Sequence, residues 1–96
     1  MTNEIAWKDS AREEVRDIYS YLFDLSPKLA DNWSEELTKK LSYIDQFPEI
    51  GRIVPDYQMT EVRELFVGRY RVLYNIQEAI PRILAIRPMG RPLGKI

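Results

Sequence analysis

Residues 61–76 read EVRELFVGRYRVLYNI, and this stretch decides the fold. Apolar and polar residues alternate on both sides of Gly68-Arg69, which is the period of a β-strand. Gly68-Arg69 itself predicts a two-residue turn, with glycine first as a type II′ hairpin prefers. A second turn is expected at residues 78–79 and a third strand at residues 82–87. The stretch therefore predicts a meander of three antiparallel strands.

A strict two-residue turn also predicts which side chains share a face of the sheet. Phe66 would lie opposite Arg71, and Leu65 opposite Val72, and opposed residues share a face. One face then holds Leu65, Val72, Tyr74 and Ile76, with Arg63 at its end, and the other holds Glu64, Phe66, Arg71 and Leu73. A bulge or a longer turn would exchange some of these positions, so the register stays open at this point.

Two helices are expected upstream of the meander. Apolar residues recur at helical spacing in each, namely Ala11, Val15, Ile18, Leu22 and Leu25, then Ala30, Trp33, Leu37, Leu41 and Ile44. Ser10 with Glu13 fits a capping box at the start of the first helix. Ser26 can cap the second helix, and Pro27 suits its first position. Only a turn separates the helices, so we expect an antiparallel helical hairpin that ends at Pro48.

A short strand at residues 2–7 precedes the helices, and a loop at residues 48–60 follows them. The predicted order is β-α-α-β-β-β, an α+β fold. The helical hairpin would pack on one face of a small, mainly antiparallel four-stranded sheet. We expect one domain over residues 1–96. The loop is long for a compact domain and is therefore a place to look for function.

Composition narrows the possible chemistry. The chain of 96 residues has no Cys and no His, which excludes disulfides, thiolate metal sites and histidine-dependent catalysis by this chain alone. No apolar run is long enough to span a membrane, and no signal peptide is evident, so we expect a cytoplasmic protein. No phosphate loop, dinucleotide fingerprint, metal-ligand spacing or nucleophile elbow is present, and we expect no cofactor and no metal.

Charge divides the chain into two halves. Residues 1–48 hold six basic and ten acidic residues, whereas residues 49–96 hold eight basic and five acidic residues. Seven of the eight basic residues in the second half are Arg, whose planar fork suits phosphate and carboxylate groups. A solvated strand surface and a basic face for a partner both fit this pattern. The paired acids at residues 13–14 and 35–36 are expected on solvated helix exteriors.

Residues 62–74, together with Pro48-Glu49-Ile50-Gly51-Arg52 and the stretch at residues 18–22, resemble the RelE/ParE superfamily. These are the toxins of type II toxin–antitoxin operons, also called plasmid stabilisation proteins, and the resemblance covers nearly the whole chain. It implies one of two activities, because the scaffold hosts both. RelE-like members cleave messenger RNA in the ribosome, and ParE-like members poison DNA gyrase.

The residues favour the gyrase poison over the ribonuclease. Cleavage of RNA needs groups that give and take protons, and guanidinium groups cannot do so. In a nuclease, Arg71, Arg87 and Arg91 would be the candidate catalytic residues, but residues 88–96 hold neither Tyr nor His. In the loop, Asp56 and Tyr57 are the only proton-active candidates. We expect a gyrase inhibitor that uses binding alone, with four arginines as target contacts: Arg63, Arg71, Arg87 and Arg91.

The resemblance also implies a cognate antitoxin with a disordered segment that orders on the toxin. The expected docking surface is the groove beside the helical hairpin and the sheet edge, near Tyr19, Trp33 and Tyr43. The alternative is that these aromatic residues only close the core. Antitoxin docking predicts a large exposed apolar patch on the isolated chain. A small module that binds RNA directly is a further alternative, and exposed aromatic residues on a sheet face would mark it.

Overall fold

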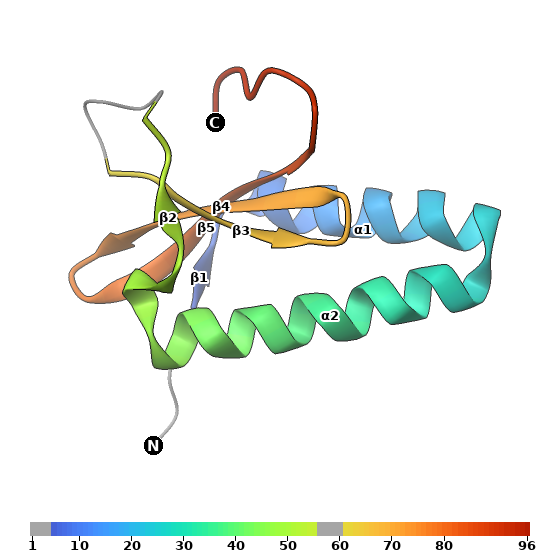
Figure 1. Cartoon of the computed structure of the whole chain (residues 1–96), viewed down its shortest axis with the longest axis horizontal. Coiled ribbons are helices and arrows are strands. Elements are labelled where there is room, and N and C mark those ends of the chain that lie inside the picture. Colours follow the sequence, from blue (N-terminus) through green and yellow to red (C-terminus); the bar gives the residue numbers. More distant parts are fainter. Residues whose placement is uncertain (1–4, 56–60) are drawn as a thin grey trace.

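The computed structural model describes residues 5–55 and 61–96. Within these residues, two long helices and five strands follow one another (Figure 1). Their bounds are β1 Ala6–Trp7, α1 Asp9–Leu25, α2 Pro27–Gln46, a 3₁₀ turn η1 Pro48–Ile50, β2 Arg52–Ile53, β3 Arg63–Val67, β4 Tyr70–Gln77 and β5 Ile80–Pro88. The predicted α+β class and the order of the predicted elements are confirmed.

The sheet has five strands in the order β1-β5-β4-β3-β2. β1 pairs parallel with β5, and the other neighbours pair antiparallel. The prediction of four strands was wrong because it placed β2 inside the loop at residues 48–60. A two-residue strand shows no alternation in the sequence, and pairing with β3 alone makes it a strand. Residues 2–4 of the predicted first strand and residues 56–60 of the predicted loop lie outside the described residues.

The predicted register of the β3–β4 hairpin is confirmed. Phe66 pairs with Arg71 and Leu65 with Val72. Gly68 has a φ of 58° and Arg69 has no positive φ, which fits the predicted type II′ turn. An irregularity lies between β4 and β5 instead, where the register shifts at Leu73/Tyr74.

Both helices lie on one side of the sheet, and the start of α1 differs from the prediction. The backbone N–H of Lys8 donates to the carbonyl of Ile83, and the Lys8 carbonyl accepts from the first helical turn. The pairing of β1 thus fixes where α1 begins, and Lys8 rather than Ser10 is its N-cap. The second cap is confirmed, because the Ser26 hydroxyl accepts from the Leu29 N–H at 3.3 Å.

The two faces of the sheet carry separate apolar clusters. The helix side holds the larger cluster, whose fully or nearly buried members are Ala11, Leu22, Ala30, Trp33, Leu37, Ile44, Val67, Val72, Tyr74, Ile83 and Ile86. The second face holds a smaller one, made of Val54, Val62, Leu73, Ala85 and Leu93. Leu93 belongs to the C-terminal tail, which curls back over the sheet on the side away from α2 (Figure 1). The tail therefore covers part of the face that the helices leave open.

Candidate functional site

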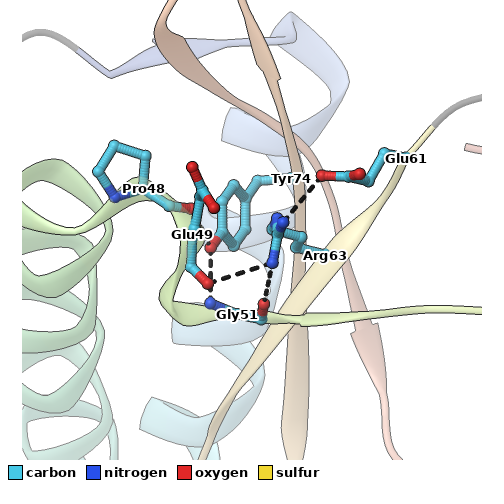
Figure 2. Close-up of polar contacts among 6 residues, drawn as sticks. All are labelled: Pro48, Glu49, Gly51, Glu61, Arg63 and Tyr74. Carbon is cyan, nitrogen blue, oxygen red and sulfur yellow. Dashed lines mark hydrogen bonds and ion pairs between the residues drawn. The ribbon is translucent and has the colours of Figure 1, made fainter.

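Arg63 is the first predicted target contact, and its side chain ties down the segment between α2 and β2. Its Nη1 donates to the carbonyls of Glu49 at 3.1 Å and Gly51 at 2.9 Å, and its Nη2 donates to the Glu61 carboxylate at 2.9 Å (Figure 2). The Nε is buried and has no partner among the described residues. The structure therefore gives Arg63 a structural role, and its part in target binding stays a prediction.

Tyr74 holds the same segment from the opposite strand position. Its hydroxyl donates to the Pro48 carbonyl at 2.6 Å and accepts from the Gly51 N–H at 2.8 Å (Figure 2). Burial raises the pKa of Tyr74 above its ordinary value, and the bond from Gly51 partly offsets that rise. Arg63 on β3 is paired with Tyr74 on β4, so both side chains lie on the helix side of the sheet. Both therefore reach the segment between α2 and β2.

Gly51 is required here because the chain passes so close to Tyr74. A Cβ atom on Gly51 would lie 2.7 Å from the Tyr74 ring and hydroxyl and 2.9 Å from the Glu64 carbonyl. Such contacts are too short for any other residue. The glycine of the PEIGR stretch thus has a packing reason, and it positions the next residue, Arg52, at the start of β2.

Arg71 lies on the second face, as the register predicts, and shares a carboxylate with Arg52. The Glu64 side chain is completely buried. Arg52 Nε donates to its Oε2 at 2.5 Å, and Arg71 Nε donates to its Oε1 at 2.6 Å. Burial opposes ionisation of Glu64, but the hydrogen bonds from Arg71 and Arg52 outweigh it and lower its pKa. Glu64 is therefore ionised at neutral pH.

Arg87 pairs across the sheet with Arg71, but its hydrogen-bonding groups are used within the chain. Nη1 pairs with the Glu14 carboxylate of α1, whose other oxygen accepts from the Ile86 N–H at 3.0 Å. Nε and Nη2 donate to the carbonyls of Leu93 and Lys95 at 3.3 and 3.0 Å. Arg87 thus joins α1 to the C-terminal tail. Glu14 was predicted to be solvated, and this pairing overturns that expectation.

Arg91 lies on the rim of a groove between the tip of the helical hairpin and the β3–β4 turn. The groove has a volume of about 630 Å³. Apolar side chains that are strongly exposed line it, including Tyr21 at 58 % and Leu25 at 61 %, with Leu29 and Met89. Arg69 and Arg91 stand at its edge. Antitoxin docking predicts an exposed apolar patch beside the helical hairpin; this groove is such a patch, and the docking of an antitoxin in it stays a prediction.

The three predicted antitoxin contacts lie in different environments. Trp33 is only 5 % exposed and donates through Nε1 to the Val67 carbonyl at 3.1 Å, so it forms the floor of the groove. Tyr19 is half-buried and donates to the Asp31 carboxylate at 2.6 Å, which ties α1 to α2. Tyr43 is half-buried on α2 and is not among the residues that line the groove. Of the three, the structure brings only Trp33 to the groove.

Among the described residues, the proton-transfer group in hydrogen-bond contact with Arg71 is the Glu64 carboxylate. Asp56 and Tyr57, the loop candidates, lie outside the described residues. Glu64 is the carboxylate that contacts Arg71, and it is held ionised. In the described part of the chain, no three His, Cys, Asp or Glu residues gather as a metal site would require. No helix among the described residues is long and apolar enough to cross a membrane.

A family model described as the ParE toxin of the type II toxin–antitoxin system parDE matches residues 5–92. The chain belongs to the ParE toxin family. It is thus a toxin of the type II toxin–antitoxin class, and the resemblance inferred from residues 62–74 is confirmed in its ParE-like branch. Among curated protein sequences, none matches the chain significantly.

Solved structures share the fold of this ParE-family chain at low sequence identity. One is the chromosomal ParDE system from P. aeruginosa, with a TM-score of 0.70 and 18 % identity, covering 90 % of this chain and 95 % of that one. Another is the archaeal RelE–RelB complex from Pyrococcus horikoshii OT3, with a TM-score of 0.61 and 14 % identity, covering 96 % and 100 %. At such identities the likeness concerns the fold.

Sequence reasoning missed Arg52 and Glu14 as site residues, and it left open whether Glu64 pairs with Arg71, which the structure shows. Glu64 carried a usable signal, because the alternation of β3 places it on the same face as Arg71. Arg52 carried a weaker one, as the last residue of the PEIGR stretch. Nothing local marks Glu14, since its partners lie 72 and 73 residues away in the chain.

Proposed function

We propose that this ParE-family toxin inhibits DNA gyrase by binding and is neutralised by a cognate antitoxin. The observation that carries the proposal is the environment of Arg71. Within the described ranges, the carboxylate in contact with Arg71 is that of Glu64, which two arginines hold ionised. A buried carboxylate in this state accepts charge-assisted hydrogen bonds and is poorly placed to shuttle protons. Membership of the ParE family supports a target other than messenger RNA.

The target contacts of the proposal follow from which arginines are still available. Arg63 and Arg87 are engaged by backbone carbonyls and carboxylates of the chain itself. Among the described residues, the terminal nitrogens of Arg71 and the guanidinium of Arg91 have no hydrogen-bond partner, and these two arginines therefore make the larger expected contribution to target binding. Because gyrase acts on bacterial DNA, the proposal places the protein in the cytoplasm.

The apolar groove is the proposed antitoxin site. Exposed Tyr21, Leu25 and Leu29 line it, and burial of such residues is the dominant favourable term in most protein association. An amphipathic segment that orders on binding would bury these residues and leave its polar side in water. The structural neighbours, solved as a ParDE system and as a RelE–RelB complex, are consistent with a toxin that has an antitoxin partner.

Pulse-labelling of DNA and protein synthesis, just after the chain is induced in a bacterium without its antitoxin, tests the proposal. The expected result is an early fall in DNA synthesis while protein synthesis continues. An early fall in protein synthesis would instead support ribosome-dependent cleavage of messenger RNA, with Arg71, Arg87 and Arg91 as candidate residues. Co-expression of the antitoxin encoded beside the toxin gene should restore labelling, and failure to do so contradicts the antitoxin part of the proposal.

A further inference from the structure

Arg52 and Arg71 are held by Glu64 in an unusual way. A guanidinium group has one N–H on Nε and four on its terminal nitrogens. Both arginines contact Glu64 through Nε, one at each carboxylate oxygen. The terminal nitrogens, which form the fork that binds carboxylates and phosphates bidentately, have no acceptor among residues 5–55 and 61–96. Glu64 thus orients both side chains, and nothing in the described part of the chain accepts from their forks.

Arg87, in the same sheet, is an arginine whose three guanidinium nitrogens all have hydrogen-bond partners. Its Nε, Nη1 and Nη2 all donate to acceptors within the chain. Arg52, by contrast, is 67 % exposed in its side chain, and its hydrogen bond to the described residues runs through Nε. Arg71 is 17 % exposed and lies between Glu64 and the cross-strand position of Arg87. The second face therefore carries two oriented guanidinium groups whose terminal nitrogens have no acceptor among the residues that the structure describes.

We propose that Arg52 and Arg71, positioned by Glu64, bind a carboxylate side chain of a protein partner. The two charges and the one carboxylate leave this cluster with a net charge of +1, which one carboxylate would neutralise. Arg71 is also part of the proposed target surface. The carboxylate site does not depend on the target being gyrase or on the docking of an antitoxin. Arg52 and Glu64 are assigned a binding and a positioning role, respectively.

The surroundings favour a protein carboxylate over the phosphates of a nucleic acid. Binding to nucleic acid depends on several cations that together follow the phosphate backbone. Here Glu64 and Glu14 lie among Arg52, Arg71 and Arg87, and the whole chain has a net charge of −1. Phe66, opposite Arg71, is exposed and adds an apolar neighbour of the kind that protein interfaces bury around a charged contact.

The test follows the Nε–H signals of Arg52 and Arg71 by NMR while acetate is added at constant ionic strength with chloride as the balancing anion. The expected result is a saturable shift of both signals. Arg52→Ala, a change at an exposed side chain, should weaken acetate binding about tenfold. Arg52→Lys should not restore it, because lysine has the charge but lacks the planar fork. Arg16→Ala, at an exposed helix position, is the matched control and should leave the titration unchanged.

Two further experiments test the positioning role of Glu64 and the chemical class of the ligand. Glu64→Gln raises the net charge of the cluster from +1 to +2 but releases both side chains, so the Arg52 signal should broaden and acetate should bind no more tightly, even where melting shows a folded protein. If Arg52→Ala leaves the acetate titration unchanged, the site does not exist. Inorganic phosphate should compete with acetate, whereas an oligouridylate hexamer at equal phosphate concentration should do so no better than free phosphate. Much tighter binding of the hexamer would overturn the assignment to a protein partner.

Discussion

Two neighbouring residues of β3, Arg63 and Glu64, lie on opposite faces of the sheet and show how differently the faces are used. On the helix side, Arg63 donates hydrogen bonds to the backbone carbonyls of residues 49 and 51. On the second face, Glu64 accepts from Arg52 and Arg71, whose terminal nitrogens have no acceptor in the described ranges 5–55 and 61–96. The charged side chain on the helix side therefore stabilises the fold, whereas the two arginines on the second face are placed to bind a partner. The charge of a residue thus does not show whether it binds a partner, because its hydrogen bonds within the chain determine whether its donors are available.

The largest expected effect concerns the floor of the groove on the helix side. Trp33→Ala removes a side chain that is 5 % exposed and donates to the Val67 carbonyl, so it should lower the free energy of unfolding by about 3–5 kcal/mol. Tyr21→Ala, at the exposed rim, should change stability by less than about 0.5 kcal/mol. Urea unfolding measures both. Equal losses in the two variants would contradict the distinction between floor and rim.

The next effect concerns the second face and depends on pH. Glu64→Gln removes the charge that two arginines share and should cost roughly 1.5–3 kcal/mol at neutral pH. The pKa of Glu64 is lowered from an ordinary value of 4.5, so its stabilisation is complete above that value and is lost as pH falls through the lower folded pKa. The gap between wild type and variant in urea unfolding should therefore narrow in acid. A gap that is constant down to strongly acidic pH would show that the charge of Glu64 is irrelevant.

A similar but slightly smaller loss is expected from Gly51→Ala. The new Cβ would lie 2.7 Å from the buried Tyr74 and 2.9 Å from the Glu64 carbonyl, so the backbone must shift at about 1–3 kcal/mol. Ile50→Ala, at an exposed neighbouring position, is the matched control. Thermal unfolding of the pair is the measurement. If both variants melt together, the segment tolerates displacement and the close contact with Tyr74 does not constrain it.

The fold was largely predictable because its main signals are local. The alternation around Gly68-Arg69 predicted the hairpin register, and Ser26-Pro27 predicted the break between the helices. What failed depends on contacts between distant residues. Strand β2 exists through pairing with β3, and the start of α1 is fixed by the bond from Lys8 to Ile83. The local pattern held no signal for either.

The candidate site was less predictable than the fold for the same reason. Arginine residues at 63, 71, 87 and 91 look alike in the sequence, but their partners come from other elements. The partners of Arg87 lie in α1 and in the C-terminal tail, and those of Arg63 lie before β2. Tertiary packing, rather than the spacing of residues in the sequence, therefore determines which arginines have donors available for a partner.

The smallest expected effect is a gain in stability at the β4–β5 turn. Glu78 and Ala79 both have positive φ, at 52° and 67°, a conformation that favours Asn and Gly. The double change Glu78→Asn and Ala79→Gly should stabilise the protein by about 0.5–1 kcal/mol, seen as a raised melting temperature. Gly68→Ala, at another residue with positive φ, should have the opposite sign. A lower melting temperature of the double variant would contradict the backbone account.

A plasmid supercoiling assay with purified toxin and purified DNA gyrase tests the central claim most directly. The account predicts that the toxin blocks supercoiling and that linear DNA accumulates after the complexes are denatured and digested. Addition of the cognate antitoxin should reverse both effects. If gyrase supercoils normally in a large excess of toxin, and the same preparation cleaves messenger RNA on translating ribosomes, the account is contradicted and the chain is a ribonuclease on a ParE scaffold.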